Sequence, residues 1–249
     1  MAALFALAIV FLNPKNEIPE CSYDAAAMLR RVGIPDVRVV SMEAIPKALA
    51  VADPVTTLYV QPGGGDDVDT SFATFFANNR KLRPSVQRFV ADGGVYLGIC
   101  LGAYAAGVEQ FDLVRDKDHD PFFSFDELDD DEARIVPVEI NNMRYSTYHQ
   151  GGPDLTPMLD VGAERFGAYV GRHGAPVGVI LPYWKNQRGT IGLLSPHFEA
   201  TNEWDDAEHG RRAGDCAVPA LAFVAQLAAA ASRHRNAATC KSPLPFCLQ

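Results

Sequence analysis

Short apolar runs alternate with helical patterns along the first half of the chain. Four runs are typical of buried strands, namely residues 4–12, 37–40, 57–60 and 95–99. Apolar residues at helical spacing after the first run predict a helix that Ser22 caps and Gly33 ends. Pro84 begins a second such helix. Strands that alternate with helices predict a mostly parallel sheet covered on both faces.

The second half of the chain is richer in strands. Residues 134–140 and 144–148 predict a hairpin that turns at Asn141-Asn142. Further strands are expected at residues 167–170, 177–183 and 190–194, before an alanine-rich closing helix at residues 219–231. No internal repeat or linker divides the chain. We therefore expect one domain over residues 1–235 and a C-terminal tail over residues 236–249.

Charge and composition narrow the classes of function. Lys and Arg number 22 against 31 Asp and Glu, a formal net charge of −9 that disfavours nucleic acid as a partner. No apolar run reaches the about 18 residues that span a membrane. The apolar start of the chain lacks the basic flank and cleavage site of a secretion signal, so a buried strand is expected there. We expect a cytoplasmic globular protein.

Cysteine and acidic residues give no sign of a metal site. The five cysteines have no repeated spacing, which favours reduced thiols over a disulfide framework or a CxxC metal site. Six of the seven residues from Asp126 to Glu132 are acidic. This stretch lacks the ligand spacing of an EF-hand, and a solvated loop is expected. Neither a metal nor a cofactor is predicted.

The strongest chemical signal is a cysteine between two glycines at the end of a predicted strand. Gly98, Cys100 and Gly102 form a G-x-C-x-G pattern, which is typical of a nucleophile elbow with Cys in place of Ser. Glycine is needed on both sides because the backbones pass too closely for a Cβ atom. We expect Cys100 at the start of the next helix, where free N–H groups and the helix dipole favour a thiolate.

A cysteine nucleophile needs a base, and the base needs an orienting group. The predicted strand at residues 190–194 leads to His197 and Glu199, whose side chains point to the same side of an extended segment. We therefore predict a Cys100–His197–Glu199 triad. Four other histidines have no such partner in the sequence and are expected at the surface, namely His119, His173, His209 and His234.

A glycine-rich loop follows the predicted strand at residues 57–60. It lacks the Lys-Ser/Thr of a phosphate loop, so nucleotide binding is not expected. The backbone N–H groups of Gly64 and Gly65, together with that of Leu101, are predicted to form an oxyanion hole. A plain strand–helix turn is the alternative.

Three segments resemble the signatures of class I glutamine amidotransferases, namely residues 62–64, 98–102 and 197–199. Further stretches are similar to the amidotransferase-like domain at the N-terminus of some biotin–protein ligases, namely residues 62–66, 90–100, 102–104 and 148–153. The resemblance covers most of residues 1–232. It implies a flavodoxin-like three-layer α/β sandwich with a mostly parallel central sheet and the cysteine at its carboxyl edge.

Two departures from these families bear on the substrate. Glutaminases usually carry Gln four residues after the nucleophile, where this chain has Tyr104, which indicates a small-molecule amide other than free glutamine. Tyr104, His149 and Gln150 are predicted to line the substrate pocket beside Gly63. The sequence holds no ligase domain after the amidotransferase-like part, so biotin transfer is not expected.

The leading interpretation is a stand-alone amidohydrolase or amidotransferase-like enzyme that works through a thioester on Cys100. A non-catalytic binding or regulatory module on the same fold remains an alternative, because fold alone does not decide function. A redox sensor is a third possibility, since the surroundings that make a cysteine nucleophilic also make it oxidisable.

Overall fold

The computed structural model describes residues 5–15, 18–64, 80–129, 132–201, 204–206 and 210–240. Within them, seven strands form one sheet, in the spatial order β2 (Asp36–Val40), β1 (Leu7–Phe11), β3 (Thr57–Gln61), β4 (Val95–Ile99), β10 (Thr190–Leu194), β9 (Gly178–Pro182) and β7 (Glu164–Phe166). The first five of these strands are parallel, whereas β9 runs antiparallel to β10 and to β7. The order of the parallel part is the 2-1-3-4-5 order of flavodoxin-like folds.

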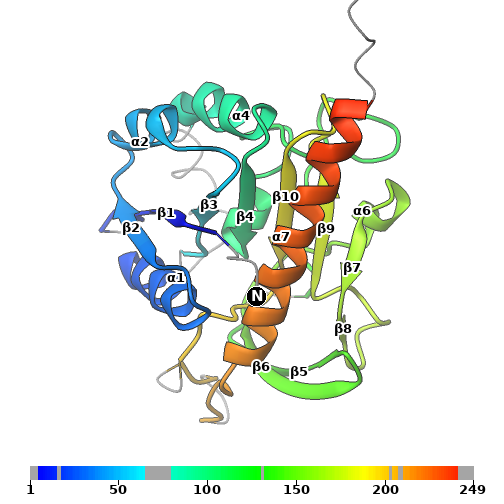
Figure 1. Cartoon of the computed structure of the whole chain (residues 1–249). Helices are drawn as coiled ribbons and strands as arrows, with labels where there is room; N and C mark the ends of the chain where they lie inside the picture. Colours follow the sequence, from blue (N-terminus) through cyan, green and yellow to red (C-terminus); the bar gives the residue numbers. More distant parts are fainter. Residues whose placement is uncertain are drawn as a thin grey trace, which may run out of the picture.

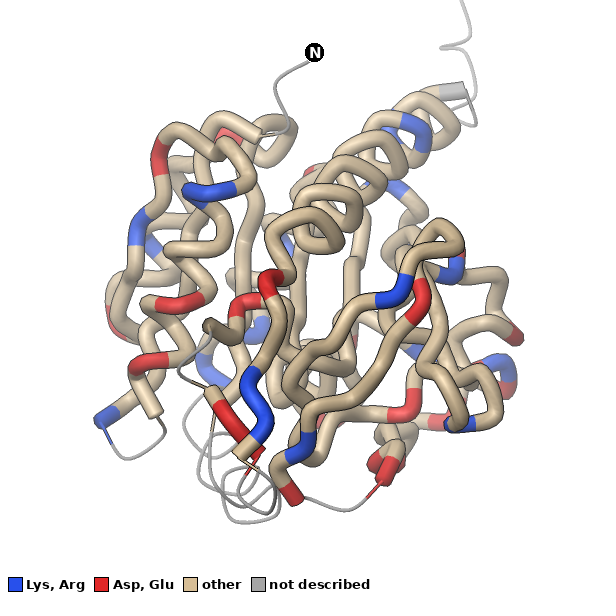
Figure 2. Tube along the Cα trace, turned by 90° about the horizontal axis from the view of Figure 1, so that it is seen from below, with Lys and Arg blue, Asp and Glu red and all other residues tan. Residues whose placement is uncertain are grey.

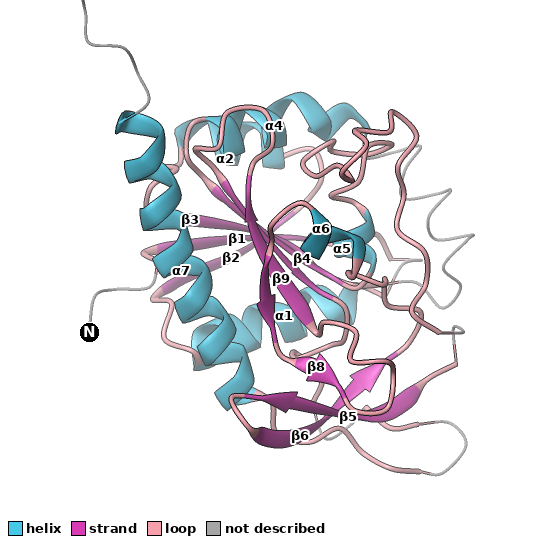
Figure 3. Ribbon diagram, turned by 90° about the vertical axis from the view of Figure 1, so that its right-hand side faces the viewer, coloured by secondary structure: helices cyan, strands magenta, loops and turns pink. Residues whose placement is uncertain are grey.

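Helices cover both faces of the large sheet. They are α1 (Pro19–Arg31), α2 (Ile45–Val51), α4 (Arg83–Ala91), α5 (Leu101–Tyr104), α6 (Pro157–Asp160) and α7 (Ala217–Cys240), with a 3-10 turn, η1 (Arg80–Leu82). Figure 1 shows α1 and α7 on one face and α2 and α4 on the other, and Figure 3 shows the same layers from the side. The predicted three-layer α/β sandwich with a mostly parallel central sheet is confirmed.

The sheet separates two apolar cores. Successive residues of a strand point to opposite faces, and β4 shows the consequence. Val95, Leu97 and Ile99 pack with α1 and α7, whereas Tyr96 packs with α2 and α4. All of β4 is buried, which explains why its sequence is continuously apolar rather than alternating.

A second, antiparallel sheet lies beside the carboxyl edge of the large one. It consists of β6 (Met143–His149), β5 (Arg134–Ile140) and β8 (Ala168–Tyr169). The predicted hairpin turn at Asn141-Asn142 is confirmed, and both residues have positive φ, as a two-residue hairpin turn requires. The strand predicted at residues 167–170 is divided differently. Gly167, with φ +64°, separates β7 in the large sheet from β8 in the small one.

Two helix boundaries differ from those predicted. α1 begins at Pro19, and Ser22 lies buried inside it, where its Oγ accepts a hydrogen bond from the Asn13 N–H at 2.9 Å. Ser22 as the N-cap was therefore wrong, because the hydroxyl serves a neighbouring loop instead. α7 continues beyond the predicted end at residue 231 to Cys240, so residues 236–240 are helical.

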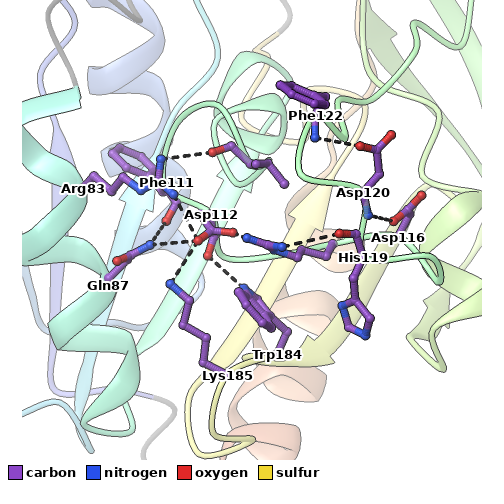
Figure 4. A network of polar contacts seen from close by, with 12 residues as sticks. Arg83, Gln87, Phe111, Asp112, Asp116, His119, Asp120, Phe122, Trp184 and Lys185 are labelled. Carbon is purple, nitrogen blue, oxygen red and sulfur yellow. Dashed lines mark hydrogen bonds and ion pairs between the residues drawn. The ribbon is translucent and has the colours of Figure 1, made fainter.

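A buried carboxylate holds the segment that follows α5. Asp112 lies 3.0 Å from Arg83, Arg115 and Lys185, and its carbonyl accepts a hydrogen bond from Trp184 at 3.0 Å (Figure 4). Burial opposes ionisation of Asp112, but Arg115 and Lys185 outweigh it and hold the pKa of this carboxyl below its ordinary value. This cluster ties α4, the segment after α5 and the loop after β9 together.

Charges of both signs lie interspersed along the described parts of the chain when the molecule is seen from the small-sheet end (Figure 2). Among the described helices, none is both long and apolar enough to cross a membrane.

Candidate active site

Three loops leave the same edge of the large sheet and meet there. β3, β4 and β10 are parallel neighbours, so the loops that follow them emerge at a shared carboxyl edge. These loops carry Gly63, Cys100 and His197, respectively. Residues from three distant parts of the sequence are thereby brought to one place.

Cys100 lies in the strained turn that the sequence predicts. Its φ of 48° and ψ of −111° are rare for a residue with a side chain. A Cβ on Gly98 would lie 2.3 Å from the Gly102 carbonyl oxygen, and a Cβ on Gly102 would lie 2.0 Å from that of Gln61. Both glycines are therefore required by close backbone approach, as predicted.

The helix after Cys100 is shorter than expected. α5 is a single turn, Leu101–Tyr104. A macrodipole is the sum of aligned peptide dipoles, so one turn contributes little of the helix-dipole stabilisation expected for a thiolate. The expected helix after Cys100 is therefore reduced to the local N–H groups of one turn.

His197 lies between Glu199 and Cys100. Its Nδ1 is 2.8 Å from Glu199 Oε1, and the Cys100 side chain is near enough to act on the charge of the imidazole. His197 and Glu199 are each only 3% exposed. Burial opposes the charged imidazole, but Glu199 and Cys100 outweigh it and raise the pKa of His197 to about 10. The structure therefore brings the three predicted side chains together in surroundings that favour the charged form of the imidazole.

The glycine-rich loop packs directly on this histidine. A Cβ on Gly63 would lie 2.4 Å from His197 Cε1, so only glycine fits. The Gly63 carbonyl oxygen accepts a hydrogen bond from Asn13 Nδ2 at 2.6 Å, which fixes the loop to the end of β1. Because Gly102 packs on Gln61, the loop and the turn after Cys100 are in contact. Gly64 and Leu101 lie in these two segments, while Gly65 lies outside the described residues. The oxyanion hole stays a prediction.

The predicted pocket residues lie around the segment that follows β6. The Cys100 Sγ lies 3.4 Å from the Gln150 carbonyl oxygen, and the Tyr104 hydroxyl donates to the Gly151 carbonyl at 3.1 Å. His149 is fully buried, with Nδ1 3.0 Å from the Tyr169 hydroxyl. Burial and the nearby Arg172 lower the pKa of His149 to about 3, so this imidazole is neutral. Their role in binding a substrate stays a prediction.

Sequence reasoning missed the aromatic side chains around His197. Tyr148 is 5.6 Å from the imidazole between ring centroids, and Trp204 is 5.2 Å from it. The Thr147 hydroxyl donates a hydrogen bond to the His197 backbone carbonyl. The His197 backbone N–H donates to the Tyr148 carbonyl. Tyr148 lies at the end of the strand predicted at residues 144–148, and that position could have pointed to it. No pattern in the sequence points to Trp204.

Two other cysteines are buried, as Cys100 is. Burial raises the pKa of the Cys21 and Cys216 thiols, that of Cys216 to about 11. Cys247 and the side chain of Cys240 lie outside the described residues. Within the part of the chain that the structure describes, no three His, Cys, Asp or Glu side chains are grouped as metal ligands.

The remaining histidines are only partly as predicted. His119 and His173 are exposed, and His209 lies outside the described residues. His234 was wrongly predicted as a surface residue. It is half-buried on α7 with Nδ1 2.8 Å from the Thr190 hydroxyl, and burial lowers its pKa.

Comparisons with known proteins agree with this architecture. Residues 19–118 match the family model described as "Biotin-protein ligase, N terminal", which is less than half of the chain. A search of the curated proteins finds no match.

Similarity to solved structures extends over more of the chain than the family model does. A chain in the structure of PurLQS from Thermotoga maritima aligns with a TM-score of 0.55 at 16% identity, covering 89% of this chain and 98% of that one. A glutamine amidotransferase from Thermotoga maritima aligns with a TM-score of 0.43 at 15% identity, covering 94% and 93%. Gan42B, a GH42 beta-galactosidase, aligns with a TM-score of 0.43 at 14% identity, covering 77% and 27%. The predicted class I glutamine amidotransferase-like fold is confirmed.

Proposed function

We propose that this protein is a cysteine-dependent amidohydrolase or amidotransferase-like enzyme with Cys100 as nucleophile, His197 as acid and base, and Glu199 as the orienting group. One observation carries the proposal. The buried imidazole of His197 is held by Glu199 through Nδ1 at 2.8 Å, and Cys100, in a strained turn, lies near enough to help raise the pKa of the imidazole. This is the arrangement that activates a thiol for nucleophilic attack.

The geometry supports a two-step reaction. The Cys100 sulfur attacks the amide carbonyl carbon, and the protonated His197 donates its proton to the nitrogen as the carbon–nitrogen bond breaks. The amine leaves and a thioester remains on Cys100. His197 then takes a proton from water, whose oxygen attacks the thioester carbonyl and releases the acid and the thiol. N–H groups of Gly64, Gly65 and Leu101 would stabilise the oxyanion in both steps.

We infer that the substrate is an amide other than free glutamine. Tyr104 stands where glutaminases usually carry Gln, and its hydroxyl is engaged by the Gly151 carbonyl. A buried phenol at this position takes space that a glutamine side chain would use. The purified protein is therefore expected to release ammonia from glutamine far more slowly than the about 1–10 turnovers per second of an ordinary enzyme. Turnover at that ordinary rate that is lost in Cys100→Ala would contradict this inference.

Selective labelling tests the nucleophile. Native protein treated with iodoacetamide near neutral pH is expected to be alkylated at Cys100 before Cys21 and Cys216, whose buried thiols have raised pKa values. His197→Asn should lower the Cys100 rate, whereas His173→Asn, at an exposed loop position, should not. Equal labelling of the three thiols, read by peptide mass spectrometry, would remove the basis of the proposal.

A specific observation favours a second candidate, a non-catalytic binding or regulatory module. Cys100 is only 5% exposed, and the Gln150 carbonyl oxygen lies 3.4 Å from its sulfur. The segment that carries this carbonyl therefore lies over the sulfur and restricts access to it. The two candidates are separated by acyl transfer: a module binds a small molecule without forming a thioester.

A further inference from the structure

Two aromatic rings lie against the imidazole of His197. Trp204 lies against the imidazole with ring centroids 5.2 Å apart and an angle of 44° between the planes. Tyr148 meets His197 edge-on at 5.6 Å and meets Trp204 edge-on at 4.9 Å. The three rings form one cluster in which each fixes the orientation of the other two.

A hydrogen bond ties Trp204 to α1. Its Nε1 donates to Asp24 Oδ2 at 3.0 Å, which joins the segment after β10 to α1. The backbone around it is also held, since the Trp204 N–H donates to Thr201 and its carbonyl accepts from Ala213. An indole with a bound N–H cannot rotate freely, so Asp24 determines where the ring lies against His197.

We propose that Trp204 is a positioning residue for His197 and that Asp24 holds it in place. The inference rests on the proposed function of the Cys100–His197–Glu199 group. The ring of Trp204 packs against the imidazole, so Trp204 acts by fixing the plane of that imidazole.

A cavity beside Glu199 has room for water. Asp24 and Glu199 both line a cavity of about 50 Å³ between α1, the loop after β10 and the start of α7. That volume exceeds what one water needs. A shift of Asp24, which also holds the Trp204 indole, would change the wall of this cavity next to Glu199. Water beside Glu199 weakens its attraction for the His197 imidazolium.

The charged and titratable groups near His197 come from several elements. Glu199 lies on its own loop, Cys100 follows β4, and Tyr148 and His149 come from β6. Cys21 and Asp24 come from α1 and face Glu199 or its cavity. Of these groups, Glu199 and Cys100 stabilise the imidazolium. Loss of the Trp204 contact is therefore expected to weaken the interaction of His197 with Glu199 and Cys100.

The test is the rate of Cys100 alkylation by iodoacetamide across about pH 5 to about pH 10. Trp204→Phe keeps a ring but loses the donor, and Asp24→Ala loses the acceptor. Asp24→Asn keeps an acceptor and is the rescue control. Trp184→Phe is the matched control, because its Nε1 also donates to an oxygen at 3.0 Å, that of Asp112, away from His197. Thermal unfolding is measured for every variant.

We expect Trp204→Phe and Asp24→Ala each to slow alkylation near neutral pH about tenfold and to move its rise to higher pH. Asp24→Asn should restore the profile, Trp184→Phe should retain it, and the double variant Trp204→Phe/Asp24→Ala should be no slower than either single one. Wild-type profiles in Trp204→Phe and Asp24→Ala would overturn the inference alone. Unselective labelling of the wild-type protein would overturn the proposed function and the inference with it.

Discussion

Glycine makes room for the reactive side chains at three positions. Gly98 and Gly102 let the backbone turn sharply around Cys100, and Gly63 lets the loop after β3 lie against His197. The first two follow from the G-x-C-x-G spacing and could be predicted. The contact of Gly63 with His197 could not, because it depends on how two loops that are distant in sequence pack. The sequence therefore predicts the turn around Cys100 but not the packing of Gly63 on His197.

The pKa values of the two buried histidines of the site are shifted in opposite directions. His197 has a raised pKa of about 10 and His149 a lowered pKa of about 3, against an ordinary value of 6.5. Proton linkage then gives His197 a stabilising contribution that is full below pH 6.5 and lost as pH rises toward 10. The contribution of His149 is present above pH 6.5 and lost as pH falls toward 3.

Ring-resonance NMR checks this pair of predictions. At about pH 8 the His197 imidazole should still be protonated, and at about pH 5 that of His149 should still be neutral. Glu199→Gln should bring the His197 titration down toward 6.5, because the carboxylate that stabilises the imidazolium is gone. The stability difference between wild type and this variant should shrink as pH rises. A His197 that titrates near 6.5 in the wild type would contradict the account.

Among the elements, strands were better predicted than helix ends. β4 and β10 have the predicted bounds because each is a continuous apolar run that ends in a distinct turn. α1 begins earlier than its apolar periodicity indicates, since a proline starts it and Ser22 bonds to Asn13. α7 extends beyond its predicted end. The prediction stopped too early because the polar final turns of this helix show no apolar repeat. Periodicity reports a buried face, not the point at which a helix stops.

The Asp112 cluster is expected to stabilise the fold rather than the chemistry. Asp112→Asn removes the negative charge that Arg83, Arg115 and Lys185 share, while Asn still tolerates the φ of 50° at this position. Because the three cations are partly exposed, we expect a loss of about 2 kcal/mol in the free energy of unfolding.

Urea unfolding measures this loss, and an exposed ion pair supplies the control. Asp36→Asn breaks the pair between Asp36 and Arg38, and we expect a much smaller loss of stability from it because solvent screens both exposed charges. Cys100 alkylation should remain close to wild type in folded Asp112→Asn. Equal effects of Asp112→Asn and Asp36→Asn on the free energy of unfolding would show that the Asp112 cluster does not stabilise the fold.

At the scale of the whole molecule, the site exists because the parallel sheet gathers distant segments at one edge. Gly63, Cys100 and His197 meet there, as the strand–helix alternation and the three motifs predicted. The sequence could not reveal the contact of Trp204 with Asp24, which bridges positions 180 residues apart. Nor could it place the small sheet, whose strand β6 brings the Gln150 carbonyl to Cys100. Such contacts are set by tertiary packing rather than by local pattern.

Acyl transfer to Cys100 from an activated ester is the most direct test of the central claim, because it needs no knowledge of the natural substrate. With p-nitrophenyl acetate, we expect a burst of nitrophenolate with the acetyl group on Cys100, followed by slower turnover. Cys100→Ala should show no burst, and His197→Asn should deacylate more slowly than wild type. Acetylation spread over Cys21, Cys100 and Cys216, or a burst that survives in Cys100→Ala, would contradict the assignment of Cys100 as nucleophile.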